Sequence, residues 1–443
     1  MMIIDLVPVR KKEKILAGAL NPVRHLLPTD LIESWCREID YDWRERMFGP
    51  VVTLLACVWQ QLHDLSLREV DDWVASFLHD PESAPDGKAF CSARARLPKE
   101  LLEKALRHVG SYCVSKAARV FHGMRVVITD GTTLRTPRQD AHYKRFGCAR
   151  NGKGLRGSPL VRVVALVCLG SGAVRDVACG GFTEISEVGL FRKLVSTLSG
   201  ALVLYDAGFV NFMSFVDARL HSTHVLGALK GTRKGTVIRK LGEGDELQLW
   251  NRPRRRDVKY WTEGCPETIE VRVITGTVTR PGYRPYSIKL CTTLLDAEKY
   301  PAAELVALYC ERWKIETDFR TLKTLYPLGE LSGKTPEVVE KEILSGLLAY
   351  NIVQAFMSET QTSPRKLSHA RARQLLISQS ERMAAAPTRL LIMLYNQLVT
   401  EISRCKLREQ KKKPQPRRIL PRVSKYPTLK SRKKWRAEYE AAS

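Results

Sequence analysis

The chain has 443 residues with ordinary hydrophobic (44%) and charged (27%) fractions, so it is long enough for two or more domains around a sizeable core. Its formal net charge of +25 is not ordinary and indicates a polyanionic partner, usually nucleic acid and sometimes a membrane surface. The 11 cysteines include no CxxC pair and the 9 histidines show no zinc-ligand spacing, which argues against a structural zinc site and favours buried, reduced thiols.

The first part of the chain is predicted to be helical. Four stretches carry apolar residues at helical spacing, and several begin with the Thr, Pro or Gly residues that often start helices. They are TDLIESWCREI (29–39), GPVVTLLACVWQQL (49–62), LREVDDWVASFL (67–78) and PKELLEKALRHVGSYCVSKAARV (98–120). We therefore expect an all-α N-terminal domain over residues 1–120.

The pattern then changes to short β-branched runs, two of which end in an acid, Asp130 or Asp206. The helix expected between them has Ser186 as its N-cap candidate. The expected elements are strands over 124–130, 200–206 and 223–230, a hairpin over 159–182 that turns at Gly170–Gly172, and helices over 186–198 and 211–221. This order favours an α/β fold with a mixed sheet flanked by helices, as in RNase H-like domains.

Strand-like runs and the basic patch RPRRR (252–256) then interrupt this order, which predicts a β-rich insertion over residues 231–297. Helices are expected again from 301 to about 404. The most apolar segment, 343–357, is too short to cross a bilayer and predicts a buried helix, so we expect no membrane partner. The core would then comprise residues 121–230 and 298–360.

The end of the chain is strongly basic. Residues 405–436 contain 14 Lys or Arg, one acid and four prolines, a composition typical of segments that are disordered when free. We therefore expect a helical C-terminal region with a basic tail over residues 361–443, and expect the tail to add sequence-independent phosphate binding.

The stretch YCERWKIETDFRTLK (309–323) places a single acid in a row of cations if it forms one helix. One stripe of that helix carries Tyr309, Arg312, Glu316, Arg320 and Lys323, and the apolar stripe beside it carries Leu308, Ile315, Phe319 and Leu322. The alternative for the polar stripe is a solvated face with i,i+4 ion pairs, which contribute only a few tenths of a kcal/mol.

Asp130, Asp206 and Glu316 together are candidates for a metal site. Two acids at the ends of central strands and a third on a later helix can hold two Mg²⁺ ions, which prefer oxygen ligands and often share their shell with substrate phosphates. Such an ion pair suits phosphodiester chemistry. Each strand-end acid taken alone is more often a turn or cap residue, so the hypothesis depends on the three together.

These residues resemble a known family, the DDE transposases of the insertion-sequence-4 type. The resemblance lies in TDGTTLRTP (129–137), LYDAGF (204–209) and the spacing Tyr309-x₂-Arg312-x₃-Glu316-x₆-Lys323. It extends to GPVVTLLACVWQQLHDLSLREV (49–70) with AFCSARARLP (89–98), which are similar to the helical end-binding region of the family. Roughly residues 45–355 are covered. One departure is Ala207, where many relatives carry a basic residue after the second acid.

The resemblance implies Asp130, Asp206 and Glu316 as catalytic ligands of two Mg²⁺ ions, with Mn²⁺ able to substitute. It implies that Tyr309, Arg312 and Lys323 contact DNA phosphates, and the polar stripe adds Arg320. The basic patch adds Arg254, Arg255 and Arg256 as a DNA-facing loop. An aromatic residue of the insertion would stack on a flipped base. Trp250 and Trp261 are the candidates, with packing in the core as the alternative.

The implied function is a DNA transposase that binds terminal inverted repeats, cleaves to expose a 3′-OH and joins that end to target DNA. Family resemblance further implies a hairpin intermediate, a homodimer in the synaptic complex, and a bacterial cytoplasmic protein that is nucleoid-associated when bound to DNA. Two alternatives stay open. One is an RNase H-like nuclease that cuts without joining, and the other is a catalytically inactive DNA-binding regulator of transposition.

Overall fold

The computed structural model describes residues 23, 25–44, 47–76, 87–150, 156–230, 235–253, 265–279, 285–384 and 386–408. By its internal contacts the chain divides into two units. The first spans residues 1–276 and 288–408 and contains the candidate active site described below. The described part of the second consists of residues 277–279 and 285–287, at the ends of two strands.

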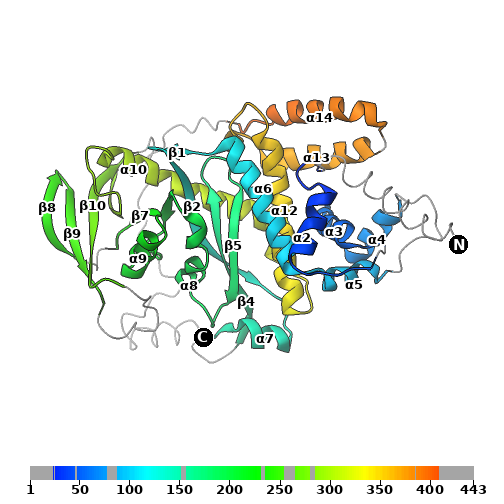
Figure 1. The fold of residues 1–443 in the computed structure, drawn as a ribbon, viewed down its shortest axis with the longest axis horizontal. Helices are drawn as coiled ribbons and strands as arrows, with labels where there is room; N and C mark the ends of the chain where they lie inside the picture. The colour runs from blue at the N-terminus through cyan, green and yellow to red at the C-terminus, as the bar shows by residue number, and fades with distance from the viewer. Residues whose placement is uncertain are drawn as a thin grey trace, which may run out of the picture. The chain divides into compact units, whose positions relative to one another are not determined.

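The strands of the described residues form one 11-stranded mixed sheet in the order β3-β4-β2-β6-β7-β11-β10-β9-β8, with β1 paired to β2 and β5 to β4 (Figure 1). Their bounds are β1 Val120–Phe121, β2 Met124–Arg135, β3 Cys148–Arg150, β4 Arg156–Cys168, β5 Val174–Gly181, β6 Ala201–Tyr205, β7 His224–Ala228, β8 Thr236–Gly242, β9 Asp245–Asn251, β10 Thr268–Val278 and β11 Tyr286–Thr292. β2, β6 and β7 are mutually parallel, β4 and β11 join this centre antiparallel, and β5 pairs antiparallel with β4.

The two faces of the central strands enter different hydrophobic clusters because side chains alternate along a strand. Val126 and Ile128 of β2 belong to one cluster, and Val127 belongs to the other. The first face is covered by α6 (Lys99–Ala117) and α12 (Pro336–Ser358), and the second by α8 (Glu187–Arg192) and α9 (Phe212–Leu220). The centre of the sheet is therefore buried on both faces.

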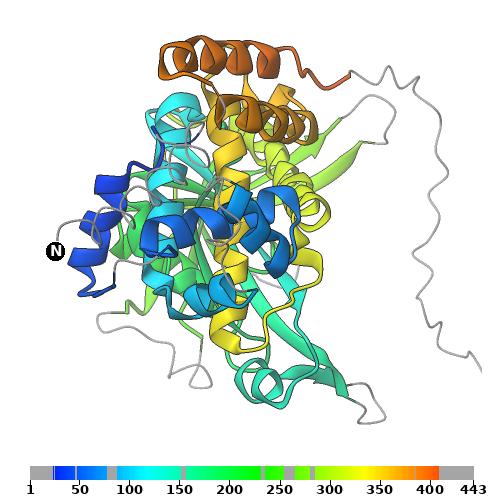
Figure 2. The same cartoon turned by 90° about the vertical axis from the view of Figure 1, so that its right-hand side faces the viewer.

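α12 is the central helix of the first layer. α6 and α3 pack against it, and α13 and α14 lie beside it (Figure 2, where α12 is yellow). The remaining helices are α2 Thr29–Glu38, α3 Pro50–His63, α4 Leu67–Ser76, α5 Ala89–Arg96, α7 Asp140–Phe146, α10 Ala302–Cys310, α11 Lys314–Leu325, α13 His369–Ala384 and α14 Thr388–Ser403. None of the helices in the described part of the chain combines the length and apolar character that crossing a membrane requires.

The expected fold class is confirmed: an RNase H-like mixed sheet flanked by helices, with helices before it and further strands after β7. The strands of residues 231–297 continue the central sheet, because β11 pairs directly with β7. The helix expected over 186–198 is shorter. Ser186 caps it by accepting a hydrogen bond from the Gly189 amide, but α8 ends at Arg192 and a 3₁₀ turn, Val195–Leu198, follows.

Candidate active site

The register of two parallel strands brings Asp130 and Asp206 together. β2 and β6 pair in parallel, and Ile128 lies opposite Leu204 at the last pair of the ladder. Each acid comes two residues later in the chain, so both reach the same edge of the sheet. Asp206 follows the end of β6 as expected, but Asp130 lies inside β2. That strand continues to Arg135 because it keeps pairing with β4 after β6 has ended.

Arg312 lies between these two carboxylates. Its Nη1 is 3.7 Å from Asp130 Oδ2, and its Nη2 is 3.4 Å from Asp206 Oδ1. The side chain is 5% exposed, and its guanidinium lies over the rings of Tyr309 and Trp313 at 5.8 Å and 5.1 Å. A buried cation thus offsets the repulsion between two acids. In the structure the charge of Arg312 is directed inward, and its contact to a DNA phosphate stays a prediction.

The environment of Asp130 disfavours a bare carboxylate. Burial raises the pKa of Asp130 to about 6, and the nearby acids Asp206 and Glu187 push it in the same direction. The Gly131 amide, which donates to Asp130 Oδ1 at 2.8 Å, and the Arg312 guanidinium act against that rise in pKa. Further positive charge at this position would therefore stabilise the ionised side chain.

The acid pair fits a hard divalent cation. Both side chains offer only oxygen donors, as Mg²⁺ prefers, and the Arg312 nitrogens lie farther away than the roughly 2.7–2.9 Å of a tight charge-assisted hydrogen bond. The third predicted ligand, Glu316, is exposed in the first turn of α11. Within the described ranges, no group of three or more metal-ligating residues is close enough to hold an ion. The structure brings two of the three predicted ligands together and leaves the third apart.

The stretch 309–323 is not one continuous helix. α10 ends at Cys310, a 3₁₀ turn (Glu311–Trp313, η4) follows, and α11 begins at Lys314. Sequence reasoning missed this break because the turn contains neither Gly nor Pro, and its flanking residues keep right-handed helical dihedral angles. As a result, Tyr309 and Arg312 are buried while Glu316, Arg320 and Lys323 are exposed. The polar stripe is divided into a buried part and an exposed part.

Comparison with known proteins identifies the family. The family model described as the transposase DDE domain matches residues 121–352, a range that contains Asp130, Asp206 and Glu316. The chain is also 28% identical over 366 residues to the transposase InsG for insertion sequence element IS4 of Escherichia coli (strain K12), covering 77% of this chain and 78% of that protein. The chain belongs to the DDE transposases of the IS4 family. The expected resemblance is thereby confirmed.

Tyr309 of the transposase makes a hydrogen bond within the protein, and its predicted phosphate contact stays a prediction. Its hydroxyl donates to the Tyr205 carbonyl at 2.9 Å, and burial raises the pKa of Tyr309 to about 12. The ring is 3% exposed. Because Tyr205 is the last residue of β6, this hydrogen bond supports the strand end immediately before Asp206. Tyr309 therefore helps to place the second acid.

Arg320 and Lys323 remain candidates for phosphate contact, since both side chains are exposed. Lys323 lies at a small apolar hollow beneath α11, whose lining includes Thr132 and Leu134 of β2. Partial burial lowers the pKa of Lys323. A cation beside β2, the strand that carries Asp130, is well placed to bind an anion near the acids.

The structure does not support Trp250 as a base-stacking residue of the transposase. Trp250 is 2% exposed and packs against Phe215 in the second hydrophobic cluster, with its indole Nε1 donating to Gln248 Oε1 at 3.1 Å. The alternative of core packing applies, because inward-facing positions of β9 join the core. Arg254, Arg255, Arg256 and Trp261 lie outside the described residues.

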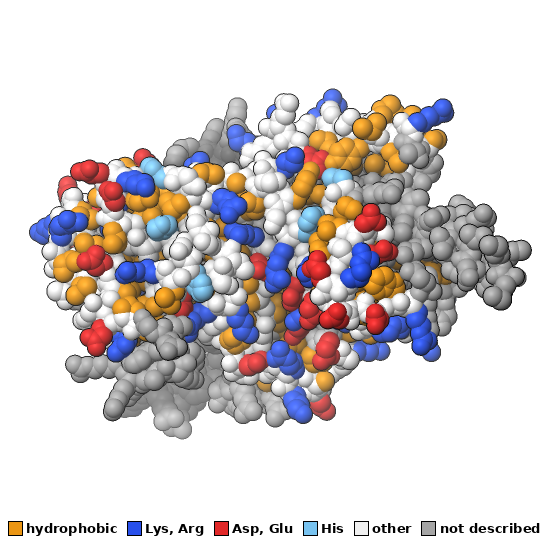
Figure 3. All heavy atoms as spheres, viewed as in Figure 1, with side chains coloured by type: hydrophobic (Ala, Val, Ile, Leu, Met, Phe, Trp, Pro, Cys, Tyr) orange, Lys and Arg blue, Asp and Glu red, His pale blue; other side chains and the backbone are white. Residues whose placement is uncertain are grey.

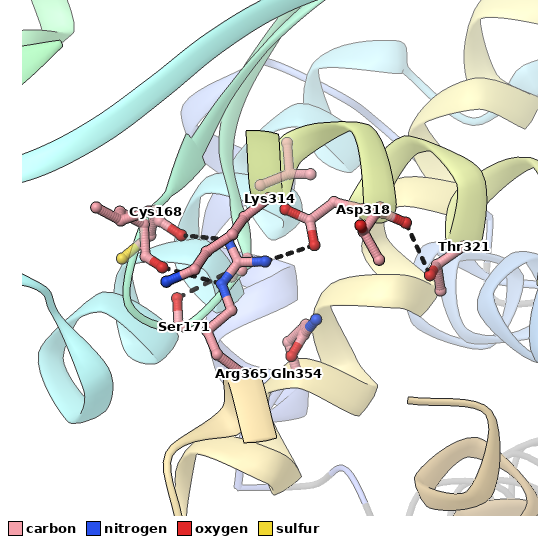
Figure 4. A network of polar contacts seen from close by, with 12 residues as sticks. Cys168, Ser171, Lys314, Asp318, Thr321, Gln354 and Arg365 are labelled. Carbon is pink, nitrogen blue, oxygen red and sulfur yellow. Dashed lines mark hydrogen bonds and ion pairs between the residues drawn. The ribbon is translucent and has the colours of Figure 1, made fainter. Parts of the chain in front are cut away.

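Several residues near the site were not found from the sequence. Trp313 is 49% exposed beside Arg312. Trp313 directly follows the arginine of the Tyr-Arg-Glu-Lys spacing, so the sequence could have indicated that it lies near the site. The buried ion pair Asp318–Arg365 anchors α11 from below (Figure 4). No local pattern predicts it, since its partners are 47 residues apart.

Proposed function

We propose that this transposase binds the terminal inverted repeats of its own element, cleaves each end to expose a 3′-OH, and joins that end to target DNA. The observation that carries the proposal is the strand register that sets Asp130 beside Asp206, with the buried guanidinium of Arg312 between them. The net charge of +25 supports a DNA partner, since phosphate contacts dominate protein–DNA affinity.

Asp130, Asp206 and Glu316 would hold two Mg²⁺ ions, with Mn²⁺ able to substitute. When bound, these ions supply Lewis-acid stabilisation of the attacking and leaving oxygens at the scissile phosphate. The fit rests on the oxygen-only donors of Asp130 and Asp206 and on the rise in the pKa of Asp130 caused by burial. Glu316 would complete the set from α11, which packs against β2.

The cationic side chains of the site have separate roles in this proposal. Arg312 holds the first two carboxylates side by side. Arg320 and Lys323 bind phosphates of the cleaved end, and the patch Arg254–Arg256 also binds DNA. Tyr309 keeps the end of β6 in place through its hydrogen bond to Tyr205.

The chain divides into four functional segments in this proposal. Residues 1–120 bind the transposon end, 121–230 and 298–360 form the catalytic core, 231–297 form the β-rich insertion, and 361–443 supply a helical region with a basic tail. Two copies would form the synaptic complex, with each subunit cleaving the end held by the other through a hairpin intermediate. Support for the assembly and the hairpin comes from family resemblance.

A strand-joining assay tests the proposal. The DNA that flanks the gene is sequenced for imperfect inverted repeats, and a short labelled duplex carrying one repeat is incubated with the protein, Mg²⁺ and a target plasmid. We expect labelled strand joined to plasmid. Cut duplex without joining would indicate the nuclease alternative, and specific binding without cleavage would indicate the regulator.

A further inference from the structure

The three proposed metal ligands come from two different elements of the fold, the central sheet and helix α11. Asp130 and Asp206 lie on neighbouring strands of the sheet, whereas Glu316 lies on α11. Their relative placement therefore depends on how firmly α11 is attached to the sheet. Residues that fix this attachment influence metal binding without touching the ion.

Arg365 makes this attachment from a 3₁₀ turn (η6, Pro364–Lys366) that follows α12. Its Nη1 donates to Asp318 Oδ1 of α11 at 2.6 Å. Its Nε donates to the Leu169 carbonyl at 2.9 Å, and its Nη2 donates to the Cys168 carbonyl at 3.2 Å. Figure 4 shows the guanidinium between α11 and the turn that leaves β4. One side chain thus joins the helix to the sheet.

The partners of Arg365 on the sheet and on α11 each lie only a few residues from a proposed metal ligand. Cys168 pairs with Val127 of β2, and Asp130 lies three residues farther along that strand. On α11, Asp318 follows Glu316 by two residues, which is about 200° around a helix. Asp318 therefore anchors the inner face of α11 while Glu316 lies on the outer face, in agreement with their burial and exposure.

Asp318 has Arg365 as its ion-pair partner, with Arg365 Nη1 2.6 Å from Asp318 Oδ1, and its side chain is 7% exposed. The Tyr350 hydroxyl lies 3.4 Å from the same Oδ1, and Oδ2 is buried without a hydrogen-bond partner among the described residues. Loss of Arg365 would leave a buried carboxylate without its cation, which α11 can relieve by moving outward.

We propose that Arg365 is a positioning residue for the catalytic carboxylates, one that fixes the helix carrying Glu316 to the sheet carrying Asp130 and Asp206. The inference rests on the proposed metal-dependent function. It adds a residue from beyond the range 121–352 that the family model matches. The positioning acts through the ion pair with Asp318 and the two carbonyl contacts at the end of β4.

The test compares Arg365→Met and Arg365→Lys with a matched control, Arg192→Met. Arg192 forms a comparable partly buried ion pair with Asp217, at 2.7 Å, that joins α8 to α9 on the other face of the sheet. Three quantities are measured on the full chain: Mn²⁺ affinity by electron paramagnetic resonance without DNA, amide hydrogen exchange over residues 314–325, and the Mg²⁺ dependence of single-turnover cleavage. Thermal melts normalise for general stability.

We expect Arg365→Met to weaken Mn²⁺ binding and raise the Mg²⁺ concentration for half-maximal cleavage by about tenfold, with faster exchange over 314–325. Arg365→Lys should lie between this variant and the wild type. Arg192→Met should lower the melting temperature and leave all three quantities unchanged. If Arg365→Met behaved like Arg192→Met, the positioning role would be overturned.

Failure of the proposed function is distinguishable from failure of this inference. A wild-type chain that neither binds Mn²⁺ through Asp130 nor cleaves would contradict the metal-dependent function itself. In that case, amide hydrogen exchange still tests whether Arg365 attaches α11 to the sheet. Unchanged exchange over 314–325 in Arg365→Met would overturn the inference, and faster exchange than in Arg192→Met would uphold the attachment.

Discussion

Arg312 is the residue whose role changes most between sequence and structure. The spacing of the Tyr-Arg-Glu-Lys pattern places it on one stripe with Glu316, and so predicts a phosphate contact. In the folded chain Arg312 lies in the 3₁₀ turn at 311–313, and its side chain points inward to Asp130 and Asp206. It therefore acts as an internal counter-ion to the two acids.

Replacing this counter-ion should make the stability of the chain depend on divalent cations. Arg312→Met leaves two neighbouring carboxylates uncompensated and should lower the free energy of unfolding by about 1–2 kcal/mol in metal-free buffer, with solvent at the half-exposed Asp206 limiting the loss. Added Mn²⁺ should then raise the melting temperature of the variant more than that of the wild type. Arg320→Met, at an exposed position, is the control. Equal Mn²⁺ shifts in all three proteins would refute the counter-ion role.

A second residue-scale prediction concerns His369, which is buried and stacks on Tyr350 with ring centroids 4.6 Å apart. Burial, with a smaller contribution from nearby Arg373, lowers the pKa of His369 to about 3. The unfolded chain takes up this proton near pH 6.5 and the folded chain does not, so the contribution to stability is complete above pH 6.5 and is lost as the pH falls toward 3.

At pH 5 this difference in proton uptake lowers the free energy of unfolding by about 2 kcal/mol, since each pKa unit corresponds to 1.36 kcal/mol. Urea unfolding of the wild type and of His369→Gln at pH 7 and pH 5 measures it. The wild type should lose about 2 kcal/mol more than the variant between the two pH values. An identical loss in both proteins would show that His369 is protonated in the folded state.

At the scale of elements, the segment formed by α10, η4 and α11 carries apolar residues that pack in the core and charged residues that are proposed to act in the site. Leu308 is 3% exposed in the main hydrophobic cluster, so Leu308→Ala should reduce the free energy of unfolding by about 2–5 kcal/mol through loss of buried surface and a cavity. Phe319→Ala should cost less, since Phe319 is partly exposed. Neither change removes a charge from the site.

Lys323→Ala should lower the cleavage rate and leave the stability of the chain nearly unchanged. Its exposed side chain contributes little packing, so the melting temperature should stay near that of the wild type. Removal of one charge-assisted hydrogen bond to a phosphate should lower the cleavage rate by on the order of a hundredfold. Melts and single-turnover rates of the three variants provide the comparison. An unchanged rate in Lys323→Ala would assign the exposed part of the stripe to a solvated face.

The order of the elements could be predicted from the sequence, but their register and their long-range contacts could not. β-branched runs marked β2, β6 and β7, and their order indicated the RNase H-like class. The continuation of β2 beyond Asp130 depends on pairing with β4, which no local pattern reveals. The same holds for the contact between Asp318 and Arg365. It holds for the burial of Trp250 as well, since the apolar alternation of β9 marks Leu247 and Leu249 and places Trp250 on the opposite face.

At the scale of the whole molecule, the positive charge is unevenly distributed. On the face drawn in Figure 3, Lys and Arg side chains are interspersed with acidic ones. The segment 405–436, by contrast, holds 14 Lys or Arg and one acid, and all of it beyond residue 408 lies outside the described residues. Much of the net charge therefore resides at the end of the chain.

Truncation after residue 408 should lower DNA affinity equally for all sequences and flatten its dependence on salt. For every phosphate that the truncated chain no longer neutralises, the slope of log affinity against log salt should become shallower by about 0.9. Binding to a transposon-end duplex and to an unrelated duplex, measured across salt concentrations, tests this. Loss of discrimination between the two duplexes at unchanged nonspecific affinity would contradict the role given to the tail.

The central claim is that Asp130, Asp206 and Glu316 are metal ligands for DNA cleavage, and exchange of their oxygen donors for sulfur tests it most directly. Asp130→Cys, Asp206→Cys and Glu316→Cys are assayed for cleavage of the transposon end with Mg²⁺ and with Mn²⁺, and Asp318→Cys is the control. A thiolate is a poor ligand for Mg²⁺ and a better one for Mn²⁺. The account predicts that all three variants are inactive with Mg²⁺ and regain cleavage with Mn²⁺, while Asp318→Cys shows no such switch. Normal Mg²⁺ activity in Glu316→Cys together with Mn²⁺ rescue of Asp318→Cys would contradict it.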